Sequence, residues 1–101
     1  MSKYIKYEMI LILNEELNES ELKTWAFKYA SQLKEFGAEE ICVISRGKRN
    51  LAYTIKNQNQ CNFIEIKFFL IPLYLKEFKE IIDLDENILR SLIIKKGAAN
   101  L

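Results

Sequence analysis

Apolar residues recur along this chain with two different periods, and the periods mark six segments. Alternation at every second position, which is typical of strands, runs through residues 4–13, 40–55, 62–71 and 88–96. Spacing of three and four positions, which places side chains on one side of a helix, occurs in two other segments. The first helical stripe consists of Leu22, Trp25, Ala26, Tyr29, Leu33 and Phe36, and the second of Leu75, Phe78 and Ile82. The predicted order is therefore strand, helix, strand, strand, helix, strand.

Residues with special backbone roles mark the ends of these segments. Asn18, with a glutamate three residues later, resembles a capping box at a helix start, and Gly37 stands where a left-handed helix end needs glycine. Gly47 indicates a bulge in the second strand, and the polar run 56–60 indicates a hairpin connection. Pro72 suits the first turn of the second helix, where its missing N–H costs nothing.

This order of elements predicts an α+β fold, a ferredoxin-like βαββαβ sandwich with a four-stranded antiparallel sheet and two helices on one face. The length of 101 residues, half of them hydrophobic, suits a single domain over residues 1–101. Right-handed crossovers place the first and third strands in the middle and the second and fourth at the edges. We expect Tyr7 in the core because it is in phase with Met9 and Leu11. The inward residues of the third strand are expected to be Ile64, Ile66, Phe68 and Leu70.

The placement of basic residues matters more than the formal net charge, which is only +1. On the predicted topology the end of the last strand lies beside the start of the first, so Lys95 and Lys96 approach Lys3 and Lys6. We expect Lys56 at this same end of the sheet. The other basic residues of interest follow the edge strands, and they are Arg46, Lys48, Arg49 and Arg90.

Two interpretations of these basic residues stay open on residue types alone. Converging ammonium groups can contact phosphates, where counterion release provides affinity. Alternatively, lysines on edge strands keep one sheet from pairing with another. Tyr4, at the same end, can stack on an unpaired base or pack in the core.

Several functional classes lack their usual residues in this chain. There is no histidine, glycine occurs three times, and Cys42 and Cys61 have no neighbouring ligands at metal-binding spacing. An acylphosphatase would need a glycine-bearing loop that binds an anion directly after the first strand. This chain has Asn14, Glu15 and Glu16 there, and the two acids would repel a phosphate. We expect no signal, transit or membrane-spanning segment before the first strand. We therefore expect no enzyme activity, metal, cofactor, small-molecule substrate or membrane partner.

The chain resembles the small ribosomal subunit protein six family of bacteria and organelles over nearly its whole length. The run arginine-x-Leu-Ala-Tyr, beginning at Arg49, is the most specific part of the resemblance. The matching segments are Tyr7-Glu8, Asn14, Phe36-Gly37-Ala38, residues 47–55 and Ile88-Leu89-Arg90-Ser91. The chain has Arg46 where the family usually has an aromatic residue and Thr54 where it has proline. The C-terminal extension of some relatives is essentially missing.

The resemblance implies a structural protein that binds the central domain of small-subunit rRNA together with small-subunit ribosomal protein eighteen. The residues expected to contact rRNA are Lys3, Tyr4, Lys6, Arg90, Lys95 and Lys96. Those expected to contact rRNA or the protein partner are Arg46, Lys48, Arg49 and Lys56. The alternative is a regulatory or ligand-binding module on the same fold, which the scarcity of glycine disfavours.

Abundant Ile, Lys and Asn with few Ala and Gly indicate an A/T-rich coding genome. This composition favours a ribosome of the plastid (chloroplast), with the bacterial cytoplasm as the alternative.

Overall fold

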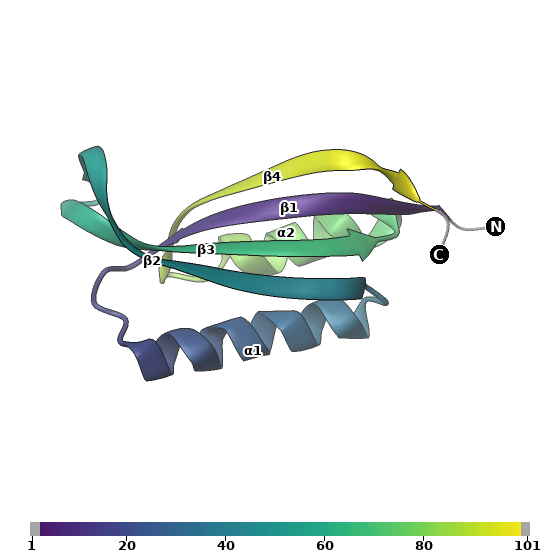
Figure 1. Cartoon of the computed structure of the whole chain (residues 1–101), viewed down its shortest axis with the longest axis horizontal. Helices are drawn as coiled ribbons and strands as arrows, with labels where there is room; N and C mark the ends of the chain where they lie inside the picture. Colours follow the sequence, from purple (N-terminus) through teal and green to yellow (C-terminus); the bar gives the residue numbers. More distant parts are fainter. Residues whose placement is uncertain (1–2, 100–101) are drawn as a thin grey trace.

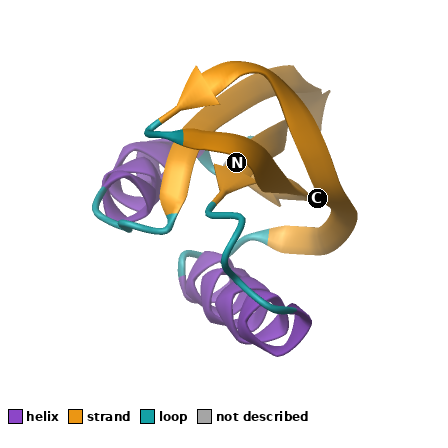
Figure 2. Cartoon of the chain, turned by 90° about the vertical axis from the view of Figure 1, so that its left-hand side faces the viewer, coloured by secondary structure: helices purple, strands orange, loops and turns teal. Residues whose placement is uncertain are grey.

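Four strands and two helices follow one another in the predicted order (Figure 1). The structure is a computed structural model that describes residues 3–99. Its elements are β1 (Tyr4–Leu13), α1 (Glu19–Glu35), β2 (Glu39–Ile55), β3 (Gln58–Leu70), the 3₁₀ turn η1 (Pro72–Tyr74), α2 (Leu75–Asp83) and β4 (Ile88–Ala99). The strands form one antiparallel sheet in the order β2-β3-β1-β4, so the first and third strands are central, as predicted. Both helices lie on one face of this sheet (Figure 2).

The hydrophobic core lies between the sheet and the two helices. Alternate residues of β1 and β3 face inward as predicted, and Tyr7 is only 5% exposed. Phe78 of α2 stands at the centre of an aromatic cluster, because its ring centroid lies 6.1 Å from that of Phe68, 6.3 Å from that of Tyr29 and 6.4 Å from that of Phe36. The core and both helices thus cover the inner face, whereas no helix within residues 3–99 covers the opposite face, which we call the open face (Figure 2).

Helix α1 begins and ends at the predicted signals. The Asn18 side chain accepts a hydrogen bond from the backbone N–H of Glu21 at 2.8 Å, and the Glu21 carboxylate accepts from the Asn18 N–H at 3.1 Å, which completes the capping box. At the other end, Gly37 has a φ of +85° and the Ala38 N–H donates to the Leu33 carbonyl at 2.9 Å. These contacts satisfy backbone groups that a helix end leaves unpaired.

The boundaries of two strands differ from the prediction. β3 begins at Gln58 because the hairpin loop is only Lys56 and Asn57, both with positive φ (47° and 65°), as a two-residue turn of type I′ requires. β4 continues to Ala99, which pairs with Tyr4. Residues 97–99, which were expected to belong to a tail over 97–101, are therefore part of the strand. The last two residues of that expected tail, 100–101, lie outside the described part of the chain. Pro72 begins the 3₁₀ turn that leads into α2.

The hairpin of β2 and β3 is sharply bent. Gly47, with a φ of +77°, lies at the predicted bulge, where the register shifts after Ser45. A second irregularity follows between the pairs Asn50↔Gln60 and Ile55↔Gln58. There, residues 51–54 of β2 stand opposite a single residue of β3. The hairpin tip therefore rises out of the line of the sheet toward the side of β4 (Figure 1).

Candidate nucleic-acid interface

The structure divides the predicted basic residues between the two ends of the sheet. One end is the terminal rim, where the start of β1 meets the end of β4, since Lys6 pairs with Gly97 and Tyr7 with Lys95. As expected, the strand ends that carry Lys3, Tyr4, Lys6, Lys95 and Lys96 lie side by side at this rim, but their side chains do not all share one face. The other end carries the hairpin group, which we define as Arg46, Lys48, Arg49, Lys56 and Arg90.

The expectation for Lys56 was wrong, because this residue lies at the end of the sheet opposite the rim. An antiparallel neighbour starts where its partner ends, and β3 starts beside the end of β1, where Leu13 pairs with Asn62. A hydrogen bond of 3.0 Å from the Glu15 N–H to the Gln58 side chain confirms this side for the hairpin. Arg90 also lies here, paired with Ile12, and does not join the lysines of the rim.

The distance between the two groups limits what they can bind together. The molecule is 46 Å long, and the ten residues of β1 that separate the two ends span about 30 Å. No single phosphate can contact both groups. The arrangement suits an extended polyanion or two separate partners.

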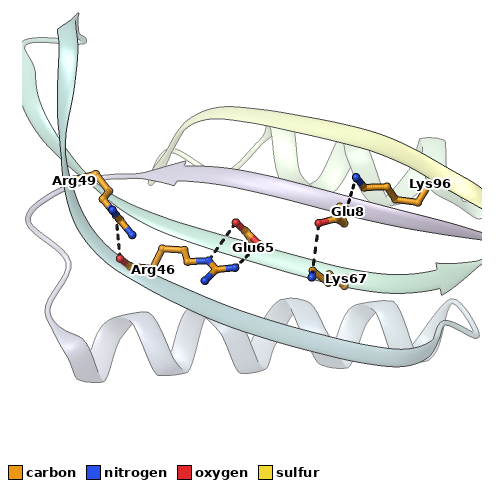
Figure 3. A network of polar contacts seen from close by, with 6 residues as sticks. All are labelled: Glu8, Arg46, Arg49, Glu65, Lys67 and Lys96. Carbon is orange, nitrogen blue, oxygen red and sulfur yellow. Dashed lines mark hydrogen bonds and ion pairs between the residues drawn. The ribbon is translucent and has the colours of Figure 1, made fainter.

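The lysine side chains of the rim lie on different faces of the sheet, and one of them, Lys96, forms an ion pair with a carboxylate. Lys95 stands opposite Tyr7 and therefore on the helix-covered face at the sheet edge, whereas Lys96 is the extra residue at a bulge. The Lys96 ammonium lies 2.9 Å from the Glu8 carboxylate on the open face, and Lys67 approaches the same carboxylate at 3.9 Å (Figure 3). The hydrogen bond from Lys96 is the main cause that lowers the pKa of Glu8. Sequence analysis missed this pairing, although strand alternation already places Glu8 on the open face.

Tyr4 lies at the terminal rim and does not pack in the buried core. Its side chain is half-buried, and its hydroxyl donates a long hydrogen bond of 3.4 Å to the Gly37 carbonyl. The ring is therefore held at the rim, outside the buried core.

Arginines of the hairpin group line a hollow of about 400 Å³ together with Phe63 and Glu65. Arg46 donates two hydrogen bonds to the Glu65 carboxylate, both at 3.2 Å, and Arg49 donates from Nε to the Arg46 carbonyl at 3.2 Å (Figure 3). These contacts fix both guanidinium groups at the bend of the hairpin.

The hairpin carries positive charge with little compensation. From Ile41 to Ile64 the sequence contains four basic residues and no Asp or Glu. Among the ion pairs of residues 3–99, the hairpin group contributes only Arg46. The rim, in contrast, has Glu8 within it and Glu39 in the same row as Lys6. Along its own strands the hairpin is therefore more uniformly basic than the rim, although the acidic loop residues Glu15, Glu16 and Glu86 lie at the same end of the sheet.

Tyr53 is a candidate that sequence analysis did not assign. Its side chain is 64% exposed, and the Arg90 guanidinium lies 5.9 Å from its ring centroid. The two residues are on opposite edge strands, so their contact follows from the bend at 51–54. Local periodicity contains no signal for a contact of this kind.

A larger hollow, of about 770 Å³, lies on the helix side near Trp25 and Asp85. The Asp85 carboxylate accepts hydrogen bonds from the Trp25 indole, the Tyr29 hydroxyl and the Asn87 N–H. Burial alone would raise the pKa of Asp85, but these hydrogen bonds together outweigh it and lower the pKa. Burial and the neighbouring Asp85 raise the pKa of Tyr29. This cluster joins α1 to the turn before β4 and is structural.

Other chemical groups in the described chain form no further candidate site. Cys42 is exposed and Cys61 buried, and neither forms a disulfide. Residues 3–99 contain no cluster of three Cys, Asp or Glu side chains placed to hold a metal ion. None of the helices in this part of the chain is long and apolar enough to span a membrane.

Comparison with known proteins identifies the family. The family described as ribosomal protein S6 matches residues 6–95. Small ribosomal subunit protein bS6c of Trieres chinensis is 53% identical over 95% of this chain and 100% of that protein, and bS6c of Phaeodactylum tricornutum is 46% identical over 90% and 93%. The crystal structure of 30S ribosomal protein S6 from Thermotoga maritima has the same fold, with a TM-score of 0.85 at 22% identity over 92% of this chain and 88% of that one. The chain therefore belongs to the ribosomal protein S6 family, among its plastid members, as a structural and non-catalytic protein of the small ribosomal subunit.

Proposed function

We propose that the protein binds the central domain of small-subunit rRNA as a pair with small-subunit ribosomal protein eighteen. The observation that carries this proposal is the separation of exposed cations into two groups at opposite ends of the sheet. Basic side chains held on a sheet contact phosphates and release counterions, which provides affinity with little sequence information. The residues proposed for rRNA are Lys3, Tyr4, Lys6, Arg90, Lys95 and Lys96.

A protein partner is supported by the open face of the sheet between the two cationic groups. No helix covers this face in the described chain (Figure 2), and Leu92 on it is 55% exposed. The ion pairs Arg46–Glu65 and Lys96–Glu8 neutralise part of the charge of the same face. A surface of exposed apolar side chains with paired charges suits contact with protein better than contact with RNA.

Pairing with a basic protein also answers an electrostatic difficulty. A chain with a net charge of +1 is a weak RNA binder on its own. When two proteins share one RNA surface, the binding of one raises the effective concentration of the other. We therefore assign Arg46, Lys48, Arg49 and Lys56, which lie beside the open face or on the hairpin, to rRNA or to this partner.

Replacing Lys95 and Lys96 together by alanine tests the contribution of the terminal rim. We expect the slope of log affinity against log salt to become shallower by about one to two, because one or two phosphate contacts are lost. The measurement is a salt titration of binding to central-domain rRNA, with and without protein eighteen. Lys76→Ala/Lys79→Ala on α2, at two exposed positions, is the matched control with the same net charge. An unchanged slope and affinity for the rim variant would rule out this contact.

A further inference from the structure

We infer that the bent β2–β3 hairpin binds an unpaired stretch of RNA, with Tyr53 stacking on a base and the hollow at Arg46 and Arg49 receiving the adjoining phosphate. This inference rests on the proposed rRNA binding. It assigns that binding a second contact, separate from the terminal rim and of different chemistry. Both ends offer ammonium groups, but the hairpin adds the strongly exposed aromatic face of Tyr53 and the guanidinium groups of Arg46 and Arg49.

The exposed ring of Tyr53 is the first observation behind this inference. A tyrosine that is 64% exposed leaves most of its apolar surface in water. The ring nevertheless stands on a strand of the hairpin, and the Arg90 guanidinium, 5.9 Å from its centroid, holds it in place. Flat bases stack on such a platform whatever their sequence, because every base has a π face.

The hollow at the bend is the second observation. Its volume of about 400 Å³ lies at the lower end of the range for small ligands, about 300–1,000 Å³. Two guanidinium groups and one carboxylate line it, so its net charge is positive, and Phe63 contributes an apolar wall. Arg46 is held by Glu65, whereas Arg49 uses only Nε in its bond to the Arg46 carbonyl. The remaining N–H groups of Arg49 are suited to a phosphate.

The composition of the hairpin distinguishes RNA from a protein partner. Protein interfaces have few charged residues at their centre, whereas the hairpin combines four cations with no acid from Ile41 to Ile64. Amide side chains fill much of the rest, and one of them, Gln60, donates to Asn50 at 2.9 Å, which fixes both amide planes. Amides, arginines and an exposed aromatic ring together are typical of sites for unpaired RNA, because a duplex hides the faces of its bases.

Tyr53→Ala in the full chain tests the stacking contact. We expect binding of an oligouridine of about twelve nucleotides to weaken about 5- to 150-fold, whereas Tyr53→Phe, which keeps the ring, retains binding. Phe27→Ala removes an aromatic ring that is 76% exposed on α1 and is the matched control, expected to bind as the parent chain does. Fluorescence anisotropy measures the affinities, with a duplex RNA of similar charge in parallel. Because Tyr53 is exposed, the thermal unfolding of its variants should match that of the parent chain.

The outcomes separate this inference from the proposed function. Loss of oligouridine binding in Tyr53→Ala, with little change for duplex RNA, supports a stacking site. Unchanged oligouridine binding overturns it, even when the Lys95/Lys96 variant weakens binding to rRNA and so supports the proposed function. Weaker capture of purified protein eighteen by Tyr53→Ala, with RNA binding intact, also overturns it, because the hairpin would then be a protein contact. Failure of the parent chain to bind rRNA, alone or with the partner, would instead contradict the proposed function itself.

Discussion

Phe78→Ala is expected to lower the free energy of unfolding by about 3–5 kcal/mol. The Phe78 side chain is fully buried, and three aromatic rings surround it with centroids within 6.4 Å. Removal of the ring loses its burial and leaves a cavity that the surrounding rings, contributed by α1, the helix end at Phe36 and β3, can fill only in part. Urea denaturation followed by circular dichroism measures the change.

The size of this effect matters because domains of this length are stable by only about 5–15 kcal/mol. The Phe78→Ala variant is therefore expected to be partly unfolded at raised temperature. Leu84→Ala is the matched control, since Leu84 is 83% exposed and its loss should change stability by less than about 0.5 kcal/mol. A loss of under 1 kcal/mol for Phe78→Ala would contradict the described core.

The triple variant Lys48→Gln/Arg49→Gln/Lys56→Gln is expected to show the largest effect on RNA binding. Loss of three phosphate contacts should make the salt slope shallower by about two to three and weaken binding to central-domain rRNA roughly 100- to 500-fold at about 0.1 M salt. Glutamine keeps the length and polarity of the side chains, and all three positions are exposed, so the fold should be unaffected. Filter binding across a salt series measures both quantities.

Charge placement, and not net charge, is what this variant examines. Lys23→Gln/Lys76→Gln/Lys79→Gln is the matched control, because it removes three exposed cations from the helices and has the same net charge. We expect the control to lose far less affinity than the hairpin variant. Equal losses of affinity for the two variants would mean that binding depends only on the net charge of the protein. The hairpin would then have no special role in RNA binding.

Much of the fold follows from local signals in the sequence. Period-two alternation identifies β1 and the inner face of β3, and the capping box at Asn18 and the glycine at Gly37 fix both ends of α1. These signals succeed because they depend on residues close together in the chain. The sheet order then follows from the handedness of the two crossovers.

The candidate site was less predictable because it depends on distant parts of the chain. The prediction for Lys56 fails because β1 and β2 are both antiparallel to β3 and therefore run in the same direction. The end of β2, with Lys56, thus lies at the end of the sheet where β1 ends, opposite the rim. The neutralising carboxylates Glu8 and Glu65 were readable from strand alternation, which places them on the open face. The contact between Tyr53 and Arg90 was not readable, since it depends on the bend at residues 51–54.

Directed hydroxyl-radical cleavage from both ends of the sheet tests most directly the claim that two separate cationic groups contact rRNA. Iron tethered at Lys56→Cys or Lys95→Cys, in a Cys42→Ser background because Cys42 is exposed whereas Cys61 is buried, can be introduced into reconstituted small subunits. We predict that each end cleaves central-domain rRNA and that the two ends cleave different segments. Particles that contain the tethered protein but show no rRNA cleavage from either end would contradict the account.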